Sequence, residues 1–313
     1  MIAYLARRLA QTVVVLVLVT LIVFGLLHAL PGGLVRSQLG PKASSFAVHQ
    51  LTRQEGLTKP LPVQYGLWLS QLFRGNLGLS YYFQTPVATL LREYFPRDLL
   101  LAGSGLVLAM ILSVPLGVFQ GARRNSLMDY GASGVVLATY SMPYFLIGAI
   151  GIVIFTNTLN LLPSTATSFG HGFATDVKAL ALPVLTLCVG NIAWFSRYVR
   201  SSVIDNLEED YVRTARAKGA SRRRILVRHV LRNSLLPYIS AVGLTLPTLV
   251  SGALVVEVLF QFPGMGKLFW TAQQHRTYPL LLGVLLLVTG AVVIGNLLAD
   301  LAYAALDPRI RYV

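Results

Sequence analysis

The sequence predicts an all-α polytopic membrane protein, and three observations support that fold class. Hydrophobic residues fill 55% of its 313 positions and charged residues only 12%, whereas a soluble domain carries about 25% charged residues. The mean hydropathy is +0.65. Several apolar runs also reach the roughly 18 residues that suggest a membrane span.

Apolar runs predict about six spans. They cover approximately residues 9–30, 99–120, 130–156, 179–194, 238–259 and 280–303. Pro143 and Pro247 fall inside two of them, where a proline kinks a helix that its neighbours can accommodate. The first run is too long for a signal peptide and lacks a clear cleavage site, so we interpret it as a retained helix.

The distribution of basic residues predicts the orientation. Segments assigned to the inside hold Arg7, Arg8, Arg123, Arg124, the dense set from Arg197 to Arg232, Arg309 and Arg311. The two shorter outer loops hold only Lys178, Lys267 and Arg276. This positive-inside bias places both termini in the cytosol. It also accounts for the net charge of +14 without any nucleic-acid partner.

Residues 31–98 form the longest polar segment. Pro31-Gly32-Gly33 marks the exit from the membrane. Tyr65, Trp68, Leu69 and Leu72 are spaced for one apolar helix face. We therefore expect a small folded extracytoplasmic unit rather than a flexible linker.

Residues 201–237 form a polar stretch between two apolar runs, and they predict a hairpin of two short helices. Asp205 or Asn206 can cap the first helix. Arg216 and Lys218 fall in its last turn, and Gly219 supplies the residue after the helix that needs no Cβ.

The second helix of this hairpin is predicted to begin at Ser221, which can cap it. Val227, Leu231 and Leu235 recur every four residues as an apolar face. The opposite side carries Arg222, Arg224, Arg228 and Arg232. Such a cationic hairpin suits contact with another protein, and a basic loop resting on anionic headgroups is the alternative.

The hairpin carries a resemblance to a known family. DYVRTARAKGAS followed by HVLRNSLLP resembles the EAA loop of ABC importer permeases, in the form found in dipeptide and oligopeptide permeases. Arg213 stands where the common pattern has glutamate, and Pro237 comes later than the common spacing. The resemblance implies a coupling helix that docks in a cleft of an ATPase subunit. The positions it implies for coupling are Asp210, Tyr211, Arg213, Thr214, Ala215, Arg216, Ala217, Lys218, Gly219, Ala220 and Pro237.

A second stretch, VVEVLFQFPGMGKL, resembles another signature of peptide permeases, in which a glutamate precedes Phe-x-x-Pro-Gly-x-Gly. Glu257, Pro263, Gly264 and Gly266 are its matching positions and our candidates for a gate or pathway. A buried carboxylate at Glu257 could equally form a structural hydrogen bond to a neighbouring helix. In the GNLGLS turn, Asn76 replaces the family's usual aspartate, as Gly33 does earlier.

The resemblance implies a fold, an organisation and a set of partners. The fold is a type I ABC importer transmembrane domain in the cytoplasmic membrane, with residues 1–98 as the first span plus outer segment, 99–305 as the transmembrane domain and 306–313 as a cytosolic tail. Implied partners are a second homologous permease chain, two ATPase domains that hold ATP and Mg²⁺, and an extracytoplasmic solute-binding protein. No cofactor is expected in this chain.

Catalytic and metal signatures are missing from the sequence. Gly264 to Leu268 lacks the spacing and the hydroxyl residue of a P-loop. No HExxH spacing and no G-x-S-x-G elbow occurs, and Cys188 is the single cysteine. We therefore expect no catalysis in this chain, and the resemblance implies a non-enzymatic permease subunit for short peptides. Nickel, glutathione or another small solute remains an alternative cargo, and a secondary transporter or channel is the alternative class.

Overall fold

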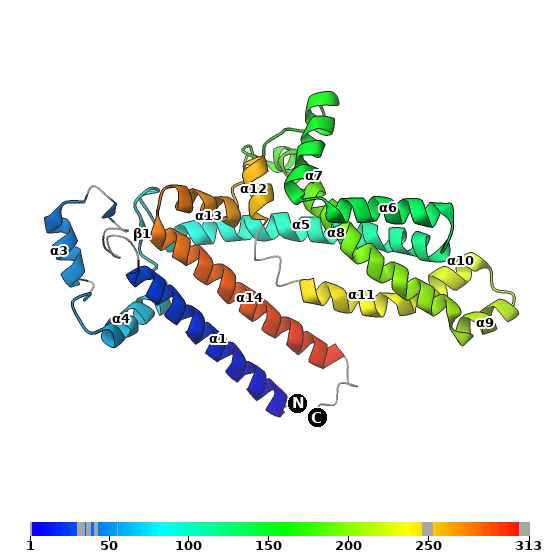
Figure 1. The fold of residues 1–313 in the computed structure, drawn as a ribbon, viewed down its shortest axis with the longest axis horizontal. Helices are drawn as coiled ribbons and strands as arrows, with labels where there is room; N and C mark the ends of the chain where they lie inside the picture. Colours follow the sequence, from blue (N-terminus) through cyan, green and yellow to red (C-terminus); the bar gives the residue numbers. More distant parts are fainter. Residues whose placement is uncertain are drawn as a thin grey trace. The chain divides into compact units, whose positions relative to one another are not determined.

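The computed structural model of the chain describes residues 2–29, 35, 39–40, 43–54, 56–245 and 253–306 (Figure 1). Within these residues the regular secondary structure is helical apart from one two-stranded sheet. They divide into two compact units. The first combines Met1–Asp98, Val250–Leu254 and Pro263–Val313, and the second combines Leu99–Leu249 and Val255–Phe262.

The first unit is built on two long apolar helices that lie side by side and antiparallel (Figure 1). Its elements are α1 (Ile2–His28), α3 (Ser45–Gln54), α4 (Leu61–Phe73), β1 (Leu79–Ser80), β2 (Thr85–Pro86), the start of α5 (Val87–Ala122), α13 (Met265–Gln274) and α14 (Tyr278–Leu306). Val23 and Leu27 of α1 pack against Leu282 of α14. The first residues of α1 and the last of α14 therefore lie at the same end of this pair.

A second core of the first unit joins the start of α5 to α13 and α14. Val87 and Leu91 pack with Met265, Leu268 and Leu280, and all five are almost fully buried. The short sheet precedes α5 and pairs β1 with β2 antiparallel.

The second unit is a bundle arranged around α8. Its elements are the rest of α5, α6 (Leu127–Ser141), α7 (Tyr144–Gly151), the π-helix η1 (Ile152–Thr158), α8 (Phe173–Glu208), α9 (Asp210–Ala217), α10 (Arg222–Arg224), the π-helix η2 (Ile225–Val230), α11 (Leu231–Thr245) and most of α12 (Leu254–Phe260). Phe195, Val199 and Val203 of α8 form the centre of its core. The helices α5, α6, α7 and α11 pack around α8 (Figure 1).

Four helices among the described residues are long and apolar enough to cross a membrane, and a bent pair would make a fifth. They are Arg7–His28, Val87–Ala122, Phe173–Glu208 and Tyr278–Leu298. The bent pair is α6 and α7, which meet at 109°. The kink predicted at Pro143 is thus a break, because Pro143 caps α7 rather than continuing α6.

Two helices extend beyond the apolar runs predicted as spans. The helix that contains the second run begins at Val87. The helix that contains the fourth run continues to Glu208. Pro247 and residues 307–313 lie outside the described residues. The predicted span at 238–259 and the predicted total of about six spans therefore remain predictions.

Candidate functional site

The coupling candidate is a hairpin formed by the end of α8, by α9 and by the helix that follows. The predicted cap at Asp205 or Asn206 was wrong, because α8 continues past both residues and α9 begins at Asp210. The apolar spacing of Val199, Val203 and Leu207 keeps this part of the helix against the core. Asn206 instead accepts a hydrogen bond from the Tyr211 hydroxyl at 2.6 Å and so ties α8 to α9.

A single buried side chain fixes α9 to the bundle. Val212 is fully buried and packs in the same core as Val203, Ile225 and Val230. Tyr211 and Ala215 are partly buried beside it. The short helix therefore has one face held by the bundle, and the rest of its surface is exposed.

The turn after α9 has the geometry predicted from Gly219. Gly219 has φ +78°, the left-handed region that glycine adopts without steric cost. Its amide donates to the Arg216 carbonyl at 3.0 Å, and the Ala220 amide donates to the Ala215 carbonyl at 3.1 Å. This pair of bonds is a Schellman motif, which satisfies the last carbonyls of the helix. Ser221 accepts a hydrogen bond from the Arg224 amide at 3.4 Å, which confirms the predicted cap.

The exposed face of α9 and its turn is cationic. Its exposed members are Asp210, Arg213, Thr214, Arg216, Ala217, Lys218 and Gly219. Among the described residues, Arg213 has one ion-pair partner, Asp210, which lies one turn away at 3.2 Å, and both side chains are exposed. A cavity of about 470 Å³ lies next to this cationic face, between α9 and the following helix. Arg216, Ala220 and Arg222 form part of its lining.

The predicted apolar face of the second helix was wrong at its first residue and is confirmed further along, where Leu231 is partly buried and Leu235 packs against the core. Val227 is 60% exposed, whereas Ile225, Val230, Ser234 and Tyr238 are buried. The physical reason is the π-helical turn η2, which spaces Ile225 and Val230 by five residues before the four-residue spacing resumes. The other prediction holds, since Arg222, Arg224, Arg228 and Arg232 are all exposed. Pro237 lies within α11, and its side chain lies outside the described residues.

Beside the hairpin lies an ion pair between a buried carboxylate and a partly exposed arginine, which the sequence did not single out. Asp129, on the first turn of α6, is 1% exposed. It accepts two hydrogen bonds from Arg200 of α8, at 2.9 and 2.8 Å. Ser133 and the Asn125 amide also donate to this carboxylate. Such a bidentate pair fixes the direction of α6 relative to α8.

The loop between α5 and α6 also contacts the hairpin. Arg124 pairs with Glu208 at 2.6 Å. Arg222 donates to the carbonyl of Ala122. Both contacts involve exposed side chains, so they orient the loop more than they stabilise it.

Small residues let α5 approach α8 closely, and sequence analysis missed them too. A Cβ on Gly117 would lie 2.6 Å from the Val199 Cβ, and one on Gly121 would lie 2.7 Å from a Val203 methyl. These positions belong to a run of small residues at every fourth position: Gly105, Ala109, Ser113, Gly117 and Gly121. This spacing was a visible signal of helix packing in a membrane.

The gate candidates fall in different units. Glu257 belongs to the second unit, where it is completely buried in α12. Its carbonyl accepts a hydrogen bond from the Phe262 amide at 2.9 Å. The Phe260 carbonyl accepts one from Ala166 at 2.6 Å, which ties the α12 turn to the loop before α8.

Pro263, Gly264 and Gly266 belong to the first unit. Gly264 is the residue before α13. A Cβ on Gly266 would lie 2.4 Å from the Cα of Leu254, so only glycine fits there. Burial lowers the pKa of the neighbouring Lys267 ammonium.

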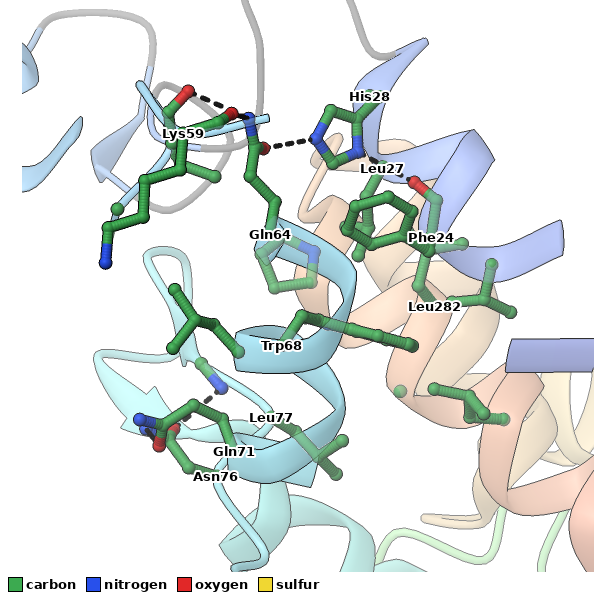
Figure 2. Close-up of a pocket in the computed structure, with 18 of the residues that line it drawn as sticks. Phe24, Leu27, His28, Lys59, Gln64, Trp68, Gln71, Asn76, Leu77 and Leu282 are labelled. Carbon is green, nitrogen blue, oxygen red and sulfur yellow. Dashed lines mark hydrogen bonds between the residues drawn. The ribbon is translucent and has the colours of Figure 1, made fainter. Parts of the chain in front are cut away.

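The first unit also contains a cavity of about 320 Å³ between α1, α4 and α14 (Figure 2). Figure 2 shows His28 of α1 facing Gln64 of α4, and their side chains are 2.8 Å apart. The Gln64 amide nitrogen donates to the carbonyls of Leu57 and Lys59. These bonds join the segment after α1 to α1 itself.

The predicted apolar face of α4 is confirmed. Tyr65, Trp68, Leu69 and Leu72 are all partly buried, and the Tyr65 and Trp68 rings lie 5.3 and 5.8 Å from the Phe24 ring. The described part of residues 31–98 is therefore a folded unit packed on α1. Asn76 accepts a hydrogen bond from the Gly78 amide at 3.1 Å, a role that needs an amide or carboxylate oxygen but no negative charge. Gly33 lies outside the described residues.

The described residues contain no group of three or more His, Cys, Asp or Glu side chains placed to hold a metal ion. Cys188 is a free, buried thiol.

Residues 113–312 match the family described as binding-protein-dependent transport system inner membrane component, and residues 1–102 match the N-terminal part of the same component. The chain therefore belongs to this family of multi-span membrane proteins.

Relatives match over almost the full length. The oligopeptide transport system permease protein AppB of Bacillus subtilis is 36% identical over 316 residues, covering 100% of both chains. The dipeptide transport system permease protein DppB of Escherichia coli K12 is 33% identical over 337 residues, covering 100% of this chain and 99% of its own.

Among solved structures, inward-facing conformations of the MetNI methionine ABC transporter match with a TM-score of 0.55 and 18% identity. The match covers 70% of this chain and 96% of the other. The fold is thus that of a type I ABC importer transmembrane subunit, as predicted.

Proposed function

We propose that this chain is the permease subunit of an ATP-driven importer for short peptides, and that α9 with the Gly219 turn is its coupling helix. The observation that carries the proposal is the combination of one buried face and one exposed cationic face on a short helix. Val212 holds α9 in the core, while Arg213, Arg216 and Lys218 are exposed and can meet a partner surface.

The packing supports a mechanism in which the ATPases move the bundle through this helix. ATP-driven closure of the ATPase domains displaces α9, and α9 carries α8 with it because Val212 and Val203 share one core. The close approach of Gly117 and Gly121 to α8 then passes the displacement to α5. The second unit moves between inward-open and outward-open states as a packed body.

Partners and orientation complete the proposal. A second permease chain shares the pathway, two ATPase domains hold ATP and Mg²⁺ on the cytosolic side, and a solute-binding protein delivers cargo from outside. Both termini are cytosolic, as the positive-inside bias favours. Residues 1–98 form the first span and outer segment, 99–305 the transmembrane domain and 306–313 the tail. Glu257, Pro263, Gly264 and Gly266 remain candidates for the gate.

Reconstitution of the complete transporter tests the cargo and the class together. The tagged chain is purified in mild detergent with its second permease and ATPases, and placed in proteoliposomes with the cognate binding protein. We expect ATP-dependent uptake of labelled di- and oligopeptides, and no uptake of nickel or glutathione. Uptake without ATP by the chain alone would contradict the importer class, and uptake of nickel or glutathione alone would contradict the cargo.

A further inference from the structure

One side of the second unit exposes aromatic rings around an arginine where α6, α7 and α8 meet. Each of these aromatic side chains is more than a third exposed: Tyr140 47%, Tyr144 39%, Trp194 37% and Tyr198 39%. Arg197 is also exposed. We call these five residues the aromatic wall.

Packing holds the aromatic wall in place. The Arg197 guanidinium lies 5.7 Å from the centre of the Tyr140 ring. The Trp194 and Tyr198 rings meet edge to face at 5.2 Å. The Tyr144 ring lies so close to α8 that a Cβ on Gly190 would come within 2.3 Å of it. Each side chain of the wall therefore lies against another member of the wall or against α8.

Arg197 and Arg200 stand one turn apart on α8 but contact residues near opposite ends of α6. Arg200 reaches the Asp129 carboxylate at the start of α6. Arg197 contacts Tyr140 of α6. Tyr140 lies eleven residues after Asp129 on α6, which is about 16 Å at the helical rise. Among the described residues, Arg200 has a carboxylate partner and Arg197 has none.

The contact of Arg197 with Tyr140, near the Pro143 end of α6, indicates what the Arg197 side chain faces. A lipid-facing arginine near the inner end of a span extends toward the nearest headgroups, which on the proposed orientation lie at the hairpin end. Arg197 extends the other way, along α6 toward the break at Pro143. A guanidinium placed so is stable beside water or an anion and costly beside acyl chains.

We propose that the aromatic wall lines the translocation pathway and that Arg197 binds the C-terminal carboxylate of the transported peptide. The inference rests on the proposed peptide function and adds the group that is recognised. A guanidinium pairs with a carboxylate through two parallel hydrogen bonds. The surrounding rings accept varied apolar side chains without requiring one shape.

The first experiment asks whether the wall faces water. Tyr140→Cys is labelled in the reconstituted transporter with a charged, membrane-impermeant thiol reagent. Wild type supplies the background because its only cysteine, Cys188, is buried. Ile22→Cys, at a position 61% exposed on the apolar helix α1, is the lipid-facing comparison. We expect rapid labelling at position 140 and almost none at position 22, and equal protection from the reagent at both would overturn the proposal.

The second experiment asks what the wall recognises. Two dipeptides with equal affinity for the binding protein are compared, one with a free C-terminus and one C-terminally amidated. Arg197→Gln should lower uptake of the free acid by about tenfold, the effect of one charged hydrogen bond, and leave the amide unchanged. Arg197→Lys should retain part of the preference, and Arg74→Gln, on the exposed end of α4, should change neither.

The outcomes separate this inference from the proposed function. If wild type imports both peptides and Arg197→Gln lowers both equally, the carboxylate site is wrong while the importer stands. If Arg197→Gln loses the second permease during purification, the wall is an interface between chains instead. If wild type imports no peptide at all, the proposed function itself fails.

Discussion

The turn after α9 and the start of α13 each depend on a glycine, but for different physical reasons. Gly219 has φ +78°, and a Cβ there would have no other atom within 4 Å, so its backbone conformation is what matters. Gly266 lies where a Cβ would come within 2.4 Å of the Leu254 Cα, so its missing side chain is what matters. Gly219 allows a left-handed backbone conformation at the surface, whereas Gly266 allows two backbones to pack in contact.

This difference separates functional from structural requirements. A Cβ on Gly219 has no neighbour within 4 Å in the described part of the chain, so we expect a loss of function there to come from local strain or from contact with a partner. A side chain on Gly266 would clash with the Leu254 backbone, so we expect a substitution there to reduce the stability of the fold. Substitutions at the two positions should therefore fail in different assays.

The largest effect is expected for Gly266→Ala. A methyl group cannot fit against the Leu254 backbone, and no rotamer change relieves a clash with main-chain atoms. We expect a loss of about 3 kcal/mol of stability, the upper range for overpacking, measured as a lower melting temperature of the tagged chain in detergent. Gly103→Ala is the control, because a Cβ there has nothing within 4 Å and alanine favours the helix. Equal melting temperatures for the two variants would show that α13 moves away from Leu254 freely.

The next effect concerns the ion pair between Asp129 and Arg200, which joins α6 to α8 beside the hairpin. Asp129→Asn keeps the shape of the side chain but removes the charge that receives both bonds from Arg200. A hydrogen bond to a charged group contributes about 1.5–3 kcal/mol, so we expect a loss of about 2 kcal/mol in the same melting assay. Glu208→Gln, which breaks the exposed pair with Arg124, should cost less than about 1 kcal/mol. The reverse order would mean that the buried pair does not fix α6 to α8.

Sequence patterns predicted the parts of the site that local chemistry decides. The left-handed Gly219, the Ser221 cap and the exposed arginines follow from the residues of one turn or one helix. The buried register of the second helix did not follow, because the η2 turn shifts Ile225 and Val230 by one residue relative to an α-helix.

Contacts distant in sequence were harder to predict. Asp129 and Arg200 are 71 residues apart, and nothing in either segment alone identifies the partner. The run of small residues on α5 did carry a signal in its four-residue spacing, yet its partner surface on α8 appears only in the packing. The continuation of α8 to Glu208 was missed because Asp205 and Asn206 resemble a cap, while Val199, Val203 and Leu207 keep the helix on the core.

The third effect directly tests the difference between Gly219 and Gly266. Gly219→Val forces a β-branched residue into the left-handed region at a cost of about 1–2 kcal/mol, so the transporter should assemble yet hydrolyse ATP without proportional uptake. Gly219→Asn, which tolerates that region, should restore coupling in large part. The measurement is the ratio of peptide taken up to ATP hydrolysed in proteoliposomes.

A matched control exists at Gly75. It has φ +77° and no neighbour within 4 Å, and its turn has the same Schellman bonds, from Gly75 to Leu72 and from Asn76 to Gln71. Gly75→Val therefore carries the same strain away from the hairpin, and should lower the melting temperature equally while leaving coupling intact. Normal coupling in a stably inserted Gly219→Val transporter would refute the role of this turn.

The smallest effect is expected at Ser221, where the hairpin's second helix begins. Ser221→Ala removes the side-chain acceptor for the Arg224 amide, and loss of such a cap costs about 1 kcal/mol. Because Val230 still anchors this helix in the core, the cost should appear as faster hydrogen exchange of the amides near Arg224, with little change in melting temperature. Ser221→Asp keeps an acceptor and should exchange like wild type. If both variants exchange alike, the Ser221 side chain does not hold this end of the helix.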